Sequence, residues 1–257
     1  MEDTVRIEPA EKTDAETLAD ICKRAFDSDV DVGAPGSGGP PGYDSPEAQI
    51  RFMKFLNYFK IVQDVIIGGI MVGSAGPEHK VLERIFVDPD LHRKGIGTKA
   101  CELLWECYPD VQLWTVGTPE WNGRTSSFYE KLGFTQIGWD LGHPLWRGRW
   151  YQWAVNPDYE LLKIKALRDG MKNVTIEGKI REKEDARTVR SRRGEPLSVA
   201  NAAVEDETGR VILVLWNEQI RWVTVDDNIR VENGYVNSFR GITQLNVGRI
   251  GRLIVLI

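Results

Sequence analysis

A glycine-containing segment is the first place in this chain where residue types and spacing suggest chemistry. The segment VDPDLHRKGIGTK follows an apolar run at 81–87 and opens a helical pattern at 94–107. Gly95 and Gly97 let the backbone approach a ligand closely, and the first N–H groups of the helix point outward at its positive end. This arrangement binds phosphate or pyrophosphate groups. Alone it is weak support, because many such turns only redirect the chain.

A second segment, WNGRTSSFYEKLGF at 121–134, makes the first more specific. Together they resemble the GCN5-related N-acetyltransferase (GNAT) family, whose first motif is (Gln/Arg)-x-x-Gly-x-(Gly/Ala) and whose second is Asn-x-x-Ala-x-x-(Phe/Leu)-Tyr. His92 stands at the Gln/Arg position and Thr125 at the Ala position, which are two departures. The resemblance covers about residues 4–155. It implies an α/β GNAT fold, with a mixed, splayed central sheet and flanking helices.

The resemblance also implies acetyl-CoA as the cofactor and assigns residues to it. Main-chain groups near Phe86 and Val87 would lie along the pantetheine and polarise the thioester, and Asn122 would contact the same arm. Tyr129 would protonate the departing thiolate as general acid, while the amine attacks directly. The residues assigned to the pyrophosphate end are His92, Arg93, Lys94, Gly95, Ile96, Gly97 and Thr98.

Three of these positions have ordinary structural alternatives. Tyr129 follows Phe128 in an amphipathic pattern, so spacing alone favours a core aromatic. Asn122 precedes a helix and suits an N-cap. Glu83 lies in the strand at 81–87 and, by the two-residue period of a strand, shares a face with Val81, Ile85 and Val87. A carboxylate there predicts either proton removal through water or an ion pair, and both remain open.

The amine acceptor is not specified by any motif. The Gly/Pro-rich segment 28–45 lies where this family shapes its acceptor site, and it is long for a loop without a function. Asp29, Tyr43 and Asp44 would suit a cationic amine, either a small molecule or a protein lysine or N-terminus. Each of the acidic residues could equally be a solvated loop residue.

Aromatic residues on short strands mark a second constellation. The segments KIKALRDGMKNVTIEGKI, VEDETGRVILVLWNEQ and IRVENGYVNSFRGITQLNVG resemble OB-fold domains of archaeal single-stranded-DNA-binding proteins of the replication-protein-A type. The resemblance spans about 162–250. It implies that Trp216, Tyr235 and Phe239 stack on bases, which requires no particular base sequence. Large aromatics at strand ends are also common in rim packing.

Arginines cluster in the predicted loop after the first barrel strand. Arg190, Arg192 and Arg193, preceded by Arg187, could grip backbone phosphates. Four nearby acidic residues weaken the positive electrostatic potential of this cluster. The alternative is that these arginines are solvated surface charges without a ligand. The resemblance leaves DNA or RNA open.

The elements that must position these residues change character near residue 156. Helical and strand patterns alternate before it, and short strands with turns follow it, which predicts a GNAT domain at 1–155, a linker at 156–161 and a small all-β OB barrel at 162–257. The charge changes too: residues 1–160 hold 16 Lys and Arg against 25 Asp and Glu, a net of −9, and the remaining 17 against 13 give +4.

Composition excludes several other classes. The chain has 257 residues, 42% hydrophobic, which suffices for two cores. No apolar run approaches the ~20 residues of a membrane helix and no signal peptide is visible, so we expect a cytoplasmic protein without membrane contact. Three cysteines without ligand spacing predict free thiols and no metal site.

The sequence therefore predicts an acetyl-CoA-dependent N-acetyltransferase fused to an OB fold that binds single-stranded nucleic acid. Two alternatives remain at this stage. The barrel could be a protein-interaction module, including one that forms a homodimer. The chain could also be a nucleic-acid-binding protein with an inactive domain that senses acetyl-CoA, although intact Gly95, Gly97, Asn122 and Tyr129 argue against that.

Overall fold

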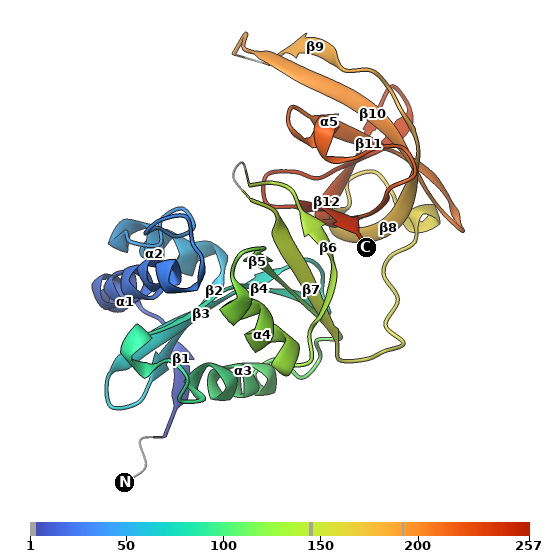
Figure 1. The fold of residues 1–257 in the computed structure, drawn as a ribbon. Helices are drawn as coiled ribbons and strands as arrows, with labels where there is room; N and C mark the ends of the chain where they lie inside the picture. The colour runs from blue at the N-terminus through green and yellow to red at the C-terminus, as the bar shows by residue number, and fades with distance from the viewer. Residues whose placement is uncertain (1–3, 144–145, 192) are drawn as a thin grey trace.

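A mixed sheet with flanking helices forms the first half of the chain and a β-barrel forms the second (Figure 1). The computed structural model describes residues 4–143, 146–191 and 193–257. The strands of the first half are β1 (Arg6–Pro9), β2 (Asn57–Val62), β3 (Ile66–Ser74), β4 (His79–Val87), β5 (Leu113–Pro119), β6 (Thr135–Asp140) and β7 (Gly148–Ala154). Its α-helices are α1 (Ala15–Asp27), α2 (Pro46–Phe55), α3 (Ile96–Glu106) and α4 (Gly123–Lys131).

The sheet of the first half runs in the order β1-β2-β3-β4-β5-β7-β6. Strands β4 and β5 run parallel to each other, and the other neighbouring strands of this sheet run antiparallel. Apolar residues of α1 and α2 pack on one face, against Tyr58, Met71 and Phe86. Those of α3 and α4 pack on the other face, around Trp114 and Tyr151. This is the predicted splayed, helix-flanked sheet.

The two central strands separate at the middle of the sheet. Pairing between β4 and β5 runs from His79 opposite Leu113 to Leu82 opposite Val116 and then ends. Beyond Leu82 the side of β4 that faces β5 has no strand partner among the described residues. The 3-10 turn η3 (Pro89–Leu91) follows β4 and leads into α3.

Glu83 occupies a β-bulge where the separation begins. The β3–β4 register shifts there, with Met71 opposite Arg84 but Val72 opposite Leu82. Leu82 consequently packs in the same core cluster as Ile85 and Val87, whereas Val81 packs in another. The predicted single face through Val81, Glu83, Ile85 and Val87 is wrong, because a bulge adds one residue and reverses the alternation.

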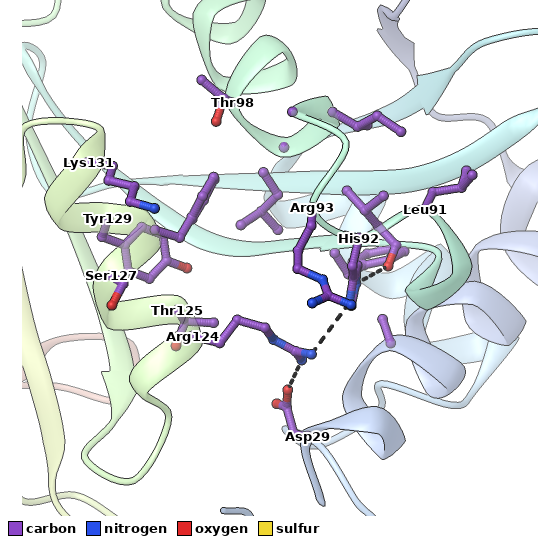
Figure 2. A pocket seen from close by; sticks show the side chains of 18 of the residues that line it. Asp29, Leu91, His92, Arg93, Thr98, Arg124, Thr125, Ser127, Tyr129 and Lys131 are labelled. Atoms are coloured by element: carbon purple, nitrogen blue, oxygen red, sulfur yellow. Dashed lines mark hydrogen bonds and ion pairs between the residues drawn. The ribbon is translucent and has the colours of Figure 1, made fainter. Parts of the chain in front are cut away.

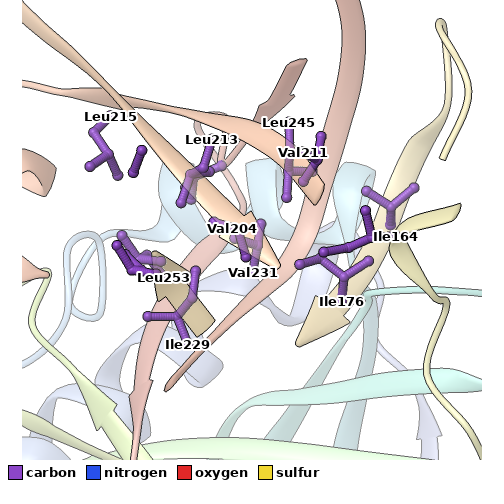
Figure 3. Packing of buried hydrophobic residues seen from close by; sticks show 14 of the residues in the cluster. Ile164, Ile176, Val204, Val211, Leu213, Leu215, Ile229, Val231, Leu245 and Leu253 are labelled. Atoms are coloured by element: carbon purple, nitrogen blue, oxygen red, sulfur yellow. The ribbon is translucent and has the colours of Figure 1, made fainter. Parts of the chain in front are cut away.

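The second half closes into a five-stranded barrel in the order β8-β10-β11-β13-β12, with β12 pairing back to β8. The β11–β13 pair is parallel. Figure 3 shows aliphatic side chains from these strands meeting in one core. The strands are β8 (Lys172–Lys183), β9 (Arg187–Arg190), β10 (Pro196–Asp206), β11 (Gly209–Trp216), β12 (Asn228–Phe239), β13 (Ile242–Asn246) and β14 (Arg252–Leu256), with the short helices η4 (Ile164–Ala166) and α5 (Gln219–Trp222).

Strand β14 joins the two halves into one sheet. It pairs with β12 on one edge and with β6 on the other, where Ile254 lies opposite Asp140. In Figure 1 β14 carries the C-terminus and lies beside β6. Residues 155–163 form no helix or strand, and the predicted linker at 156–161 lies within this segment. No α-helix of the described residues has the length and apolar character needed to cross a bilayer.

Candidate functional site

The turn before α3 presents backbone N–H groups in the way the sequence predicts. We call residues 94–98 the N–H cradle. Arg93 and Gly95 both have positive φ, +63° and +77°, which curls the backbone into a concave turn. The first helical hydrogen bond runs from the N–H of Lys99 to the carbonyl of Gly95, 3.0 Å, so the N–H groups of Ile96, Gly97 and Thr98 have no helical acceptor.

Both glycines of the cradle leave room for a ligand. A Cβ on Gly95 would meet no atom within 4 Å, and the positive φ explains why glycine stands there. A Cβ on Gly97 would lie 3.3 Å from the Phe128 ring, so any larger side chain would crowd the gap between α3 and α4. Space and donors together fit a pyrophosphate.

A cavity of about 450 Å³ lies against the cradle, and we call it the first cavity. It extends from the start of α3 along the unpaired end of β4 to α4 (Figure 2). Most of the predicted cofactor residues line it: Phe86, Val87, His92, Arg93, Gly95, Ile96, Gly97 and Thr98. Lys94 lines a separate hollow on the other side of the turn, with Lys99.

His92 braces the end of β4. Its Nε2 lies 2.9 Å from the carbonyl oxygen of Val87, and an Arg124 nitrogen lies 3.4 Å from its Nδ1. Because Arg124 can only donate, Nδ1 accepts and Nε2 donates, which makes the imidazole neutral. Burial lowers the pKa of His92 in agreement. Figure 2 shows Arg124 between His92 and Asp29, and Arg124 forms an ion pair with Asp29.

A bidentate ion pair anchors the turn on its other side. The Asp88 carboxylate accepts hydrogen bonds from both terminal nitrogens of Arg24 on α1, each at 2.8 Å. The carboxylate also accepts the N–H of Asp90, 3.1 Å away. The hydrogen bonds from Arg24 lower the pKa of Asp88. The segment that ends β4 is therefore held to α1 before it reaches the cradle.

Tyr129 lines the first cavity from α4 and is only 5% exposed. Its ring packs among Phe128, Phe134 and Tyr151, with centroid distances of 5.3 to 6.3 Å. Burial raises the pKa of its hydroxyl, so the group stays protonated at neutral pH and is able to donate a proton. Tyr129 is therefore a core aromatic and also lines the cavity, so the two interpretations of this residue do not exclude each other.

A second cavity of about 690 Å³ shares five lining residues with the first: Phe26, Asp29, Ile85, Thr125 and Tyr129. The Gly/Pro-rich segment 34–41 forms one wall, and Glu83 lies in another. Indole rings and charged groups complete it: Trp121, Trp146, Trp150, Asp140 and Arg252. Trp121 packs edge-on against Trp146 at 5.9 Å, and its buried Nε1 has no hydrogen-bond partner among the described residues.

The residues predicted for the amine acceptor divide between sites. Asp29 lines both cavities, although it is buried and paired with Arg124. Tyr43 donates its hydroxyl to Asp27 and packs on Phe26, and neither Tyr43 nor Asp44 lines either cavity. The role of the three in acceptor binding stays a prediction.

Asn122 is the N-cap of α4. Its side-chain oxygen accepts the N–H of Thr125 at 3.1 Å, and the residue is 1% exposed. It lines the second cavity and not the first. Contact with a pantetheine arm stays a prediction, and the capping role accounts for the residue by itself.

Sequence reasoning missed the indole wall of the second cavity, together with Asp140 and Arg252. These residues come from four separate segments of the chain. Trp121 alone stood beside a motif, at the start of WNGRTSSFYEKLGF. No spacing relates Arg252 to Glu83, 169 positions earlier, although their side chains meet.

The three barrel aromatics occupy one outer face, which we call the aromatic face. Val214 of β11, Asn246 of β13 and Tyr235 of β12 lie opposite one another. Trp216 and Phe239 follow at even spacing and therefore share that side, away from the core. Trp216, Tyr235 and Phe239 are 38%, 40% and 56% exposed. Arg240 lies over the Phe239 ring at 5.3 Å.

The arginine segment differs from the predicted loop. Residues 187–190 form β9, which pairs with β10, so an extended hairpin projects from the barrel. Arg190 donates to the carbonyl of Gly194, 3.2 Å away, and Arg193 is exposed in the turn. Arg187 pairs with Glu184. Arg192 lies outside the described residues.

Comparisons with known proteins find two family matches. The acetyltransferase (GNAT) domain matches residues 57–136, and the single-stranded DNA binding protein Ssb-like OB fold matches residues 168–255. The single-stranded DNA binding protein Ssb of Saccharolobus solfataricus is 31% identical over 86 residues, which are 34% of this chain and 57% of that protein. An uncharacterized protein, YrkN of Bacillus subtilis, is 35% identical over 79 residues, 30% of this chain and 43% of that protein.

The chain thus spans about half the length of the curated relatives it matches. Among solved structures, the PaiA N-acetyltransferase of Thermoplasma acidophilum in complex with coenzyme A is 15% identical with a TM-score of 0.49. The similarity covers 59% of this chain and 99% of that one.

Proposed function

We propose that this chain, which joins an acetyltransferase (GNAT) domain to an Ssb-like OB domain, transfers an acetyl group from acetyl-CoA to a primary amine and binds single-stranded nucleic acid. One observation carries the enzymatic part. Two cavities meet at Tyr129 and Ile85, and the first ends at the N–H cradle while the second ends among carboxylates and indole rings. A donor and an acceptor could therefore meet between the separated strands.

Acetyl-CoA, the donor that GNAT acetyltransferases use, supplies an activated acetyl group as a thioester. The chain contributes a place to hold it. The cradle N–H groups bind the pyrophosphate, and the unpaired end of β4 near Phe86 and Val87 offers main-chain groups to the pantetheine and the thioester carbonyl. The His92 and Asp88 contacts keep this end of β4 in position.

Two side chains, one in the second cavity and one at the junction of the cavities, carry out the proton transfers. Glu83 in the second cavity accepts the proton that the amine must lose, directly or through water. Tyr129 at the junction donates a proton to the leaving thiolate, because burial keeps its hydroxyl protonated. No covalent bond between the enzyme and the acetyl group is required.

The second cavity favours a cationic acceptor. Indole rings of Trp121 and Trp146 can face an ammonium group, and such contacts strengthen when water is excluded. The acidic lining residues Asp29, Glu83 and Asp140 outnumber the arginines, Arg84 and Arg252. An alkyl ammonium such as a lysine side chain or a polyamine has this chemistry.

The aromatic face supports the nucleic-acid part of the proposal. Three exposed rings share one side of the barrel, and every base presents a π-face on which such a ring can stack. Arg240, over the Phe239 ring, and the exposed Arg190 and Arg193 of the β9–β10 hairpin supply positive charge on the barrel. Unpaired bases suit this surface better than duplex bases, which already stack on one another.

Acetyl transfer is tested by incubating the full chain with labelled acetyl-CoA and a panel of amines, including spermidine, a lysine peptide and protein from a whole-cell extract. Acetylated amine and free CoA should appear together. Absence of transfer to every amine in the panel and the extract, in a chain that binds acetyl-CoA, would favour the sensing alternative.

Nucleic-acid binding is tested by fluorescence anisotropy of labelled oligothymidine, oligouridine and a duplex with the full chain at several salt concentrations. We expect single strands to bind more tightly than the duplex. Replacing Arg190, Arg192 and Arg193 together should flatten the salt dependence, because fewer counterions are released. A chain that ignores all three at low salt but self-associates would favour the interaction module.

A further inference from the structure

The second cavity contains a residue from the barrel. Arg252, the first residue of β14, lines it beside Glu83, Trp150 and Tyr129. A terminal nitrogen of Arg252 lies 2.5 Å from Oε2 of Glu83, and the guanidinium lies 4.8 Å from the centre of the Trp150 ring. The two charged side chains are 23% and 24% exposed. The barrel thus reaches the carboxylate that the proposed function uses as a base.

Buried polar contacts fix the position of the barrel against the acetyltransferase domain. Glu232 of β12 is fully buried and accepts hydrogen bonds from Thr115, 2.8 Å away, and from the indole of Trp150, 3.2 Å away. Arg230, 4% exposed, donates to Gln152 of β7 at 2.8 Å and to Glu177 of its own domain. Removing either partner would strand a buried polar group, so the domains have one favoured docking.

Backbone pairing and apolar packing reinforce this docking. Gly138 of β6 lies against β14 so closely that a Cβ there would come within 2.3 Å of the Val255 carbonyl oxygen. Ala75, Val81 and Trp150 pack with Ile254 of β14 in a cluster of their own. The strand that delivers Arg252 is therefore paired with the acetyltransferase sheet from Ile254 to Leu256, directly after Arg252 and Leu253.

Glu83 has reason to need a positioning partner. It sits in the bulge of β4, and its side chain lies over Gly73, where a Cβ would come within 2.5 Å of the carboxylate. Two other carboxylates, Asp140 and Glu232, surround the same guanidinium. Arg252 is a cation among them, and its hydrogen bond to Oε2 restricts the rotamers that Glu83 can adopt.

We propose that the OB barrel completes the acceptor site of the acetyltransferase domain, and that Arg252 is a positioning residue that holds Glu83 toward the acceptor amine. This inference rests on the proposed acetyl transfer and on Glu83 as its base. It makes the barrel part of the catalytic unit as well as a nucleic-acid-binding domain.

A double-mutant cycle tests the proposal in the full chain, with spermidine or whichever amine is acetylated. Arg252→Gln should lower kcat/KM for the amine on the order of 10²-fold, the effect of a slightly misplaced catalytic group, and leave the Kd of acetyl-CoA unchanged. In a Glu83→Gln background the same change should add little, because its effect passes through Glu83. Arg252→Lys should recover part of the rate.

Controls separate positioning from folding. Arg181→Gln removes an arginine that pairs with Glu205 on the same barrel but does not line the cavity, and it should leave kcat/KM unchanged. Gly138→Ala should weaken the β6–β14 pairing and reproduce the loss of kcat/KM while acetyl-CoA still binds. Thermal unfolding identifies any variant that fails to fold, in which case Arg252→Lys carries the test.

The outcomes distinguish this inference from the proposed function. Absence of acetyl transfer by the unchanged chain overturns the proposed function, and the inference falls with it. Transfer that is unaffected by Arg252→Gln, or losses from Arg252→Gln and Glu83→Gln that multiply, overturn only the inference, since Arg252 would then act through stability or another group.

Discussion

The N–H cradle and the aromatic face offer two different kinds of binding surface in one chain. The cradle uses backbone N–H groups at one end of a cavity, and its key residues are those that lack a side chain. The aromatic face uses large side chains on an open strand surface, each more than a third exposed. The cradle offers a ligand unpaired backbone N–H groups, and the aromatic face offers it exposed aromatic side chains.

This difference predicts opposite responses to mutation. A surface made of backbone groups tolerates changes of neighbouring side chains but fails when a side chain is added where the ligand lies. A surface made of rings fails gradually as rings are removed. Electrostatic effects should also be larger at the cradle, because its cavity excludes more water than an open strand face does.

The largest effect should come from the junction of the two cavities. Tyr129→Phe removes the proposed proton donor and keeps the buried ring, so turnover should fall roughly 10²–10⁴-fold with acetyl-CoA affinity nearly unchanged. Steady-state kinetics and calorimetry measure the two quantities. Tyr108→Phe is the control, since Tyr108 lines neither cavity. Full activity of Tyr129→Phe, with chemistry rate-limiting, would show that the thiolate leaves without this acid.

A side chain added to the cradle should have the next largest effect. Gly95→Asp places a negative charge beside the pyrophosphate and should weaken acetyl-CoA binding about 100-fold or more in calorimetry. Gly170→Asp is a matched control on the barrel side, because Gly170 has a similar φ of +84° and equally open space. Both variants bear the same backbone strain. Equal acetyl-CoA affinity in the two would contradict the cradle assignment.

Removal of single rings should have a smaller, graded effect. Trp216→Ala, Tyr235→Ala and Phe239→Ala should each weaken oligothymidine binding by ~1–3 kcal/mol, with little dependence on base sequence. Anisotropy titrations measure this. Phe55→Ala removes an aromatic that is 83% exposed on α2 and should not change the affinity. Equal affinities for all four variants would remove the aromatic face from the binding surface.

The smallest effect concerns the anchor that holds the cradle turn to α1. Asp88→Asn should lower the free energy of unfolding at pH 7 by about 1 kcal/mol, because the pair with Arg24 is partly solvent-screened. The pKa of Asp88 is lower in the folded chain than in the unfolded one. Its contribution is therefore full above the unfolded value of about 3.9 and is lost as pH falls through the folded value.

Urea unfolding at several pH values measures how much the Asp88–Arg24 ion pair contributes to the free energy of unfolding. The difference between the natural chain and Asp88→Asn should shrink as the pH is lowered from 7 toward 2. Asp20→Asn is the comparison variant, since Asp20 contacts the same guanidinium but is 67% exposed. A difference that stays constant with pH would mean that the Asp88 carboxylate acts through something other than its charge.

Local patterns predicted much of this molecule. Ser45 and Pro46, residue types favoured at helix starts, begin α2, and the serine oxygen accepts the N–H of Ala48. The order of helices and strands, the cradle turn and the barrel strands also follow the sequence. Both resemblances are confirmed by the family matches to residues 57–136 and 168–255. These features depend on neighbouring residues, through periodicity, capping and glycine geometry.

Two errors have a common physical origin. The bulge at Glu83 is invisible in a pattern that reads as regular alternation, because it depends on how β3 aligns with β4. Strand β9 was predicted as a loop, because its four residues are stabilised by pairing with β10 and not by an apolar pattern. Long-range strand pairing decided both.

The sequence alone determined which residues could do chemistry: Gly95 and Gly97 before a helix, Tyr129 and Asn122 in a second motif, and three aromatics on short strands. It did not determine which of them meet. The tertiary structure placed Tyr129 where two cavities join, separated Tyr43 and Asp44 from both, and brought Arg252 to Glu83. Contacts of this kind depend on how strands pair across the whole chain, and no local spacing encodes them.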